Sequence, residues 1–158
     1  MRAMTKRRVL VLAVAAGGLI VAASLRAAAP PGHFVINGAI VTDTVTGLVW
    51  QKTPDATKRN YSTGNSWCTT NGSGLPGTGW RLPNIKELST LFDAAASAPR
   101  WDASFGGAVD SPYWSSDSRP PGCPTTGFCQ LDFDFNSGVV GSGNANDATT
   151  LWYVRCVR

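Results

Sequence analysis

Histidine and charge are scarce in this sequence. The only histidine is His33, and charged residues make up 15% of the chain. Catalytic sites of the Ser-His-Asp and Cys-His types need a histidine beside the nucleophile. Because His33 stands alone near the start of the domain, we expect it to be a solvent-exposed residue and the protein not to be an enzyme. Internal repeats and strand–helix–strand alternation are also lacking, which argues against solenoid and parallel α/β folds.

Acidic residues are missing before Pro30, where five basic residues lie. Residues 1–8 are basic, residues 9–25 form an uninterrupted apolar run, and small residues follow, which is the order of a secretory signal peptide. We therefore predict a signal peptide over residues 1–29. An uncleaved membrane anchor is the alternative, since the run approaches the shortest transmembrane length. The basic triplet at 6–8 leaves twin-arginine export open beside the general secretory route.

The net charge of +4 comes from the basic residues of the predicted signal peptide. The whole chain has 14 Lys and Arg against 10 Asp and Glu, so removal of five basic residues leaves a nearly neutral domain. Nucleic-acid binding needs a basic face, and we expect none. Residues 30–158 are long enough for a single domain with its own core.

Cysteines are few and even in number. All four lie in the predicted domain, at Cys68, Cys123, Cys129 and Cys156. An even count in an exported chain favours two disulfides, for which three connectivities are possible. Zinc is disfavoured, because the spacings are not CxxC and the only histidine is distant.

The pattern of apolar residues predicts an α+β fold. Asn37-Gly38 is a strong hairpin signal, and residues 130–135 alternate between apolar and acidic positions. We expect two short helices on one small, mostly antiparallel sheet, with a loop-rich second half. The expected strands are 34–36, 39–41, 48–50, 113–116, 130–135, 139–140 and 151–157, and the expected helices are 61–70 and 84–96.

The most patterned stretch begins at Trp80. Asn84 and Glu87 form a capping-box pair at the start of a helix. Arg81 is expected to pair with a carboxylate or with backbone carbonyls and so fix the turn before that helix. We interpret the stretch as a determinant of the fold rather than a binding site. Its structural residues are Trp80, Arg81, Leu82, Pro83 and Glu87.

Several motifs in order along the chain resemble the Lcl C-terminal domain family, named for the end domain of a collagen-like bacterial adhesin. The matching motifs are Thr46-Gly47-Leu48-Val49-Trp50, Trp67-Cys68, Trp80-Arg81-Leu82-Pro83-Asn84, Tyr113-Trp114-Ser115-Ser116 and Tyr153-Val154-Arg155-Cys156. The resemblance implies a C-type-lectin-like fold, similar also to formylglycine-generating-enzyme domains. It implies that the terminal strands pair and that the disulfides are Cys68–Cys156 and Cys123–Cys129.

Ligand-binding residues are expected in the loops after Trp114 and before Leu151. The candidates are Trp101, Trp114, Asp117, Arg119, Asn144, Asn146 and Asp147. No metal or other cofactor is expected, but calcium is open, because carboxylate and amide oxygens are its usual ligands. The calcium candidates are Asp132, Asp134, Asn146 and Asp147. The alternative, which we favour, puts Asp132 and Asp134 on the solvated face of an amphipathic strand.

These observations predict an exported binding module that is periplasmic, attached to the cell surface or secreted, and that acts in adhesion on glycans or another surface polymer. The resemblance motivates the ligand class, since the named adhesin binds sulfated polysaccharides. A structural module that contacts an envelope protein is the first alternative, and an enzyme of the formylglycine-generating branch is the second. The membrane is expected as a partner only if the N-terminal segment stays uncleaved.

Overall fold

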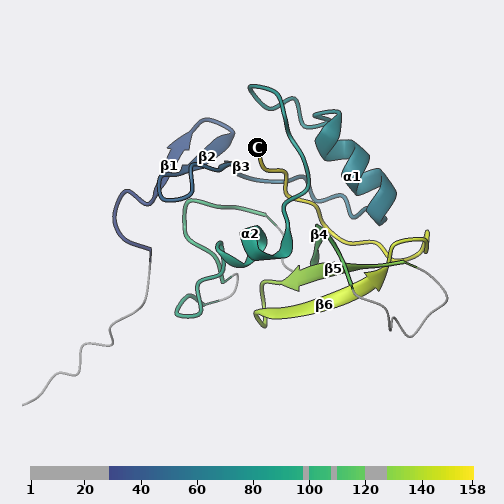
Figure 1. Ribbon diagram of the computed structural model, residues 1–158. Helices are drawn as coiled ribbons and strands as arrows, with labels where there is room; N and C mark the ends of the chain where they lie inside the picture. The colour runs from purple at the N-terminus through teal and green to yellow at the C-terminus, as the bar shows by residue number, and fades with distance from the viewer. Residues whose placement is uncertain (1–28, 98–99, 108–109, 120–127) are drawn as a thin grey trace, which may run out of the picture.

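The computed structural model describes residues 29–97, 100–107, 110–119 and 128–158 (Figure 1). Two helices and two separate three-stranded antiparallel sheets make an α+β fold, as predicted, but the expectation of one sheet is wrong. The first sheet has the order β1-β2-β3 and the second β4-β5-β6. The elements are β1 (Phe34–Asn37), β2 (Ile40–Asp43), β3 (Val49–Gln51), α1 (Tyr61–Thr69), α2 (Ile85–Ser89), β4 (Tyr113–Ser118), β5 (Cys129–Asp134) and β6 (Val139–Asn144).

The first sheet is built on the predicted hairpin. Gly38 has φ +59°, which a residue with a side chain rarely adopts, and this lets β1 turn directly into β2. A second turn follows β2, where Asp43 Oδ1 accepts hydrogen bonds from the backbone N–H groups of Val45 and Thr46. These two turns fix the register that places Val41 and Trp50, both fully buried, on the core side.

Figure 1 shows the second sheet below α2, with β6 at its outer edge. Phe133 and the following Phe135 are buried in the main core, as the alternation of β5 predicts. The preference for a solvated Asp132 is wrong, since its side chain is buried beside Gly141 of β6 and Oδ2 has no hydrogen-bond partner in the described residues. A strand in the middle of a sheet can be covered on both faces, and periodicity alone does not show this.

Burial of Asp132 makes the stability of the fold depend on pH. Burial, with a smaller contribution from the charge of Asp134, raises the pKa of Asp132 to about 7. Between the unfolded-state pKa near 4 and this value the folded protein holds more protons than the unfolded chain, so stability falls as pH rises. Above pH 7 the folded protein carries a buried carboxylate that forms no ion pair with any described residue.

We expect Asp132→Asn to raise the free energy of unfolding at pH 8 by about 2 kcal/mol, because the neutral amide removes this penalty but needs partners of its own. At pH 4 the two proteins should be equally stable. Urea unfolding at both pH values measures the difference, and Asp93→Asn is the control because Asp93 accepts a backbone hydrogen bond from Ala95 N and lies outside the second sheet. An equal effect of Asp132→Asn at pH 4 and pH 8 would contradict the role of ionisation.

The start of α2 confirms the predicted cap. Asn84 accepts from Glu87 N and the Glu87 carboxylate accepts from Asn84 N, both at 2.8 Å. The predicted pairing of Arg81 is also confirmed, since its guanidinium binds the Glu87 carboxylate through two hydrogen bonds of 2.8 Å. The helix itself ends at Ser89 rather than Ala96. Phe92 instead forms a β-bridge with Trp101, which draws the chain out of the helix.

The C-terminal segment runs through the centre of the molecule (Figure 1). It was predicted as a strand over 151–157, but the structure shows isolated bridges because its backbone partners lie on several different segments. Tyr153 bridges to Tyr113, and Val157 bridges to both Trp50 and Arg81. In the first sheet the C-terminal segment therefore pairs with β3, whereas the first strand, β1, pairs with β2.

The Cys68–Cys156 disulfide joins the end of α1 to this C-terminal segment, as the resemblance implied. The second expected pair, Cys123–Cys129, stays a prediction, because Cys123 lies outside the described residues. The C-type-lectin-like topology also stays a prediction. No helix within the described residues is both long and apolar enough to cross a bilayer, and the signal peptide predicted for residues 1–29 lies almost wholly outside them.

Candidate functional site: a polar pocket beside the disulfide

A pocket of about 480 Å³ opens where the first sheet meets α1. The β1–β2 turn, the end of β3 with the residues after it, α1 and the loop after α1 each contribute to its wall. The pocket is lined by Gly38, Ala39, Gln51, Lys52, Thr53, Asp55, Trp67, Ser73 and Leu75. Amide, hydroxyl, ammonium and indole groups therefore surround one cavity, and each of them can donate a hydrogen bond to a ligand.

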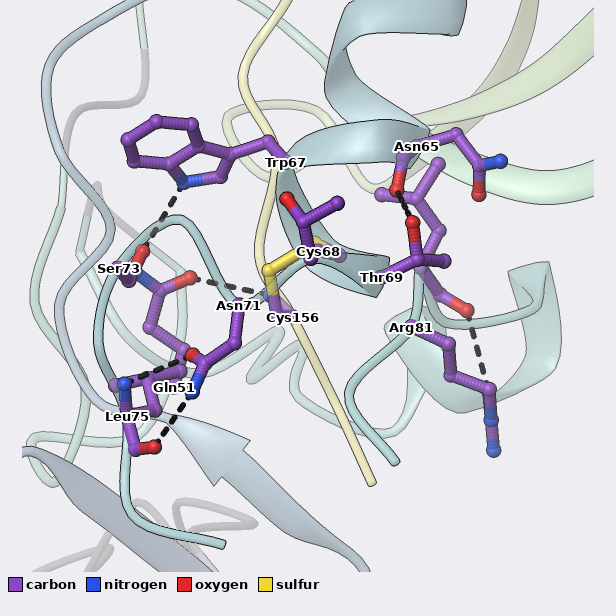
Figure 2. Close-up of a disulfide and its surroundings, with 12 residues drawn as sticks. Gln51, Asn65, Trp67, Cys68, Thr69, Asn71, Ser73, Leu75, Arg81 and Cys156 are labelled. Carbon is purple, nitrogen blue, oxygen red and sulfur yellow. Dashed lines mark hydrogen bonds between the residues drawn. A yellow bond between two sulfur atoms is a disulfide. The ribbon is translucent and has the colours of Figure 1, made fainter. Parts of the chain in front are cut away.

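Ser73 occupies the middle of a hydrogen-bonded chain in this wall, and Figure 2 shows it beside the indole of Trp67. Its hydroxyl oxygen accepts from Gln51 Nε2 and from Trp67 Nε1, each at 3.0 Å. The Gln51 amide is oriented by the backbone N–H of Cys156, which donates to Oε1 at 3.2 Å. A hydroxyl has two acceptor positions and one proton. Since both acceptor positions of Ser73 are used, its proton is left to donate to a ligand.

The loop that carries Ser73 is held in shape by Asn71. Its side chain donates to Leu75 O at 2.7 Å and accepts from Leu75 N at 2.8 Å (Figure 2). Gly72 packs directly on the Trp67 ring, where a Cβ would lie 2.4 Å from a ring carbon. A glycine is therefore required for the loop to approach α1 this closely.

Arg59 covers part of the same indole. Its guanidinium lies 4.1 Å from the centre of a Trp67 ring and is held there by Asp55 through hydrogen bonds of 2.8 and 2.7 Å. These hydrogen bonds lower the pKa of Asp55, so the carboxylate stays ionised and neutralises Arg59. Because Arg59 and Gly72 both pack on Trp67, the indole is fixed in the wall of the pocket rather than left free to stack.

Lys52 supplies the net charge of the pocket. Among the described residues its ammonium forms no ion pair, whereas the other charged residue that lines the pocket, Asp55, is paired with Arg59. The pocket thus offers one uncompensated positive charge beside the Ser73 hydroxyl. This arrangement favours a ligand that carries oxygen acceptors and a negative charge.

Arg155 fixes the backbone below the pocket. It is completely buried, and its guanidinium donates to the carbonyls of Gln51 and Lys52, both at 2.7 Å, and of Gly106 at 2.6 Å. Burial lowers the pKa of Arg155 to about 10. Sequence reasoning missed this residue, because alternation in the last segment placed it opposite the core-facing side chains and gave no sign that both faces are covered.

Two aromatic residues expected to line the surface are buried. Trp114 is fully buried, donates its indole N–H to Arg59 O at 2.8 Å and packs on Trp152. Trp101 is also buried, and its ring packs against Tyr113 and Phe135. The expectation that they line the surface is wrong, because a position beside a loop in sequence does not show what other segments cover the side chain. Their role in ligand binding stays a prediction.

The remaining candidates lie in the second sheet or in the segments that follow its strands. Arg119 N donates to Cys129 O, and Cys129 is paired with Asn144, so the structure brings Arg119 and Asn144 to the same end of the sheet. Asp117 accepts from Ile85 N at 2.9 Å and so stabilises the start of α2. None of these residues lines the pocket beside the disulfide.

The loop before Leu151 uses its side chains for its own turns. Asn144 Oδ1 accepts from Asn146 N, and Asp147 Oδ1 accepts from both the N–H and the hydroxyl of Thr149. Within the ranges the structure describes, no three His, Cys, Asp or Glu side chains are grouped as a metal site. Calcium binding by Asp132, Asp134, Asn146 and Asp147 therefore stays a prediction.

His33 is not the exposed residue that the sequence suggested. Its Nε2 lies 3.0 Å from Asp43 Oδ1, and its side chain is 21% exposed. His33 stacks on Phe34 and, with Asp43, ties the start of the domain to the turn after β2. The part of the chain that the structure describes contains no free cysteine.

The sequence profile of the Lcl C-terminal domain family matches residues 39–158, most of the chain. A comparison with curated proteins found no match. The matched range contains both sheets apart from β1, both helices, the disulfide and all but one of the pocket-lining residues. The chain therefore belongs to the Lcl C-terminal domain family.

Proposed function

We propose that this domain is an exported module that binds an acidic glycan of a cell surface in the pocket beside the Cys68–Cys156 disulfide. The family is that of a surface-associated module. Disulfides persist in oxidising compartments outside the cytosol, which agrees with such a location. The glycan and the pocket are the new elements of the proposal.

The observation that carries the proposal is the pairing of a free donor with a free cation. Ser73 has a proton to donate, and Lys52 has no carboxylate partner in the described part of the chain. Sugars offer many oxygen acceptors, and acidic sugars add a carboxylate or sulfate that an ammonium binds. Arg155 and the disulfide hold these groups in place before any ligand arrives, which reduces the entropy lost on binding.

A glycan array probed with the purified protein, with and without a chelator, tests the ligand class. We expect binding to acidic glycans in both conditions and weaker binding to their neutral counterparts. Lys52→Gln should raise the dissociation constant for acidic glycans about tenfold, which corresponds to the loss of a hydrogen bond to a charged group. The control is Lys86→Gln, which removes the same charge from the exposed side of α2.

Ser73→Ala separates the hydroxyl from the charge. This substitution should weaken the binding of neutral and acidic glycans to the same extent, since it removes a hydrogen-bond donor without changing the net charge. Array results without any binding, in either condition, would rule out the glycan proposal. Equal loss with Lys52→Gln and Lys86→Gln would show that overall charge, and not the pocket, governs the interaction.

A further inference from the structure

The outer edge of the second sheet is unprotected. β6 pairs with β5 alone, and the backbone of residues 139–143 makes no backbone hydrogen bond to any other described segment. Every second residue of an edge strand points its N–H and C=O groups outward. Natural edges are normally blocked by lysine, proline or a bulge, and the β6 sequence VVGSGN has none of these.

Apolar surface gathers at the same edge. Of the seven large apolar side chains exposed in the described residues, three lie on or directly beside β5 and β6: Phe128, Val139 and Val140. Phe128 O accepts from Ala145 N, so this side chain stands at one end of the β6 edge while the valines stand at the other. Exposed apolar groups along an open strand are a feature of protein interaction sites.

A hollow on one face of this edge combines an apolar end with a cation. It is lined by Arg119, Leu131, Val140, Gly141 and Ser142. Val140 and Ser142 are two residues apart and so project to the same face of β6. Arg119 reaches across to donate to Ser142 Oγ at 3.0 Å, and its guanidinium has no carboxylate partner among the described residues.

We propose that β6 binds an extended segment of a partner protein by strand addition, with an apolar side chain opposite Val140 and an acidic side chain two positions away at Arg119. Backbone pairing along an open edge gives such a complex its affinity, and alternate side chains give it specificity. A second copy of this chain fits less well, because antiparallel pairing of two β6 strands brings two unpaired Arg119 side chains toward each other. This surface is separate from the pocket beside the disulfide.

The test uses isotope-labelled protein and blocked threonine-rich peptides that carry valine and glutamate two positions apart. We expect the peptide to shift the backbone amide signals of residues 139–143 and to protect half of them from hydrogen exchange. Replacing the glutamate by lysine should abolish binding. Arg119→Gln should weaken it about fivefold, as for an exposed ion pair, whereas Val35→Lys on the other open edge, β1, should leave it unchanged.

Two further measurements can overturn the proposal. A peptide N-methylated at alternate residues cannot pair with a strand, so undiminished binding by that peptide would exclude strand addition. Sedimentation of the protein alone tests whether a second copy of the chain covers β6. A dimer that Val140→Lys disrupts would show that it does. Arg119→Gln changes one surface side chain, and its unchanged amide spectrum outside the edge shows that the variant is folded.

Discussion

Replacing Arg155 by methionine is expected to lower the free energy of unfolding by about 4 kcal/mol, the size expected for breaking a buried polar network. Methionine has a similar length but donates no hydrogen bonds. The change removes the guanidinium donor from the carbonyls of Gln51, Lys52 and Gly106 at a fully buried position, and Lys52 O keeps only the N–H of Gly106. It also removes a cation that lies 4.9 Å from the ring centre of Trp101.

Chemical denaturation of the wild type, Arg155→Met and Arg155→Lys measures this effect. Lysine keeps the charge but lacks the planar fork that reaches three carbonyls, so it should be at least as destabilising as methionine. Lys86→Met, on the exposed side of α2, is the control and should change stability by less than about 0.5 kcal/mol. A loss below 1 kcal/mol for Arg155→Met would show that the network contributes little to folding.

Removing the Cys68–Cys156 disulfide is expected to cost about 4–5 kcal/mol. The two residues are 88 positions apart, and closing a loop of that length removes much of the entropy of the unfolded chain. The double variant Cys68→Ser with Cys156→Ser is the suitable test, because it leaves no unpaired thiol at this position. Unfolding in urea without reductant gives the difference in free energy.

The same variant should also weaken binding in the pocket. Cys156 N orients the Gln51 amide, and Cys68 lies next to Trp67 at the end of α1, so the disulfide supports both donors to Ser73. Both cysteines are buried, and the bond should therefore resist reductant in the folded protein. Rapid reduction of the native protein, with no loss of stability, would contradict this role.

The hypotheses separate cleanly in experiment. Lys52 and Ser73 belong to the pocket, whereas Arg119 and Val140 belong to the β6 edge, and the two sets share no residue. If the protein binds glycans but no acidic peptide, the glycan proposal stands and the strand-addition proposal fails. The reverse result would favour the assembly module considered from the sequence.

Local chemistry decided the features that the sequence alone could predict. The cap formed by Asn84 and Glu87 and the turn at Gly38 each depend on residues within a few positions of one another. The alternation of β5 likewise predicted that Phe133 would be buried. Motifs spread along the chain gave the family and, through it, the Cys68–Cys156 pair.

Only the tertiary structure decided the features that depend on contacts between distant segments. Arg155 finds its three carbonyls on segments about 50 and 100 residues away, and Ser73 is placed by Gln51, 22 residues earlier. Asp132 looked solvated because a pattern of alternation shows which residues share a face but not whether that face is covered. The C-terminal segment contacts both sheets and is joined to α1 by the disulfide, and its path buries Arg155 and places Cys156 N against the Gln51 amide of the pocket wall.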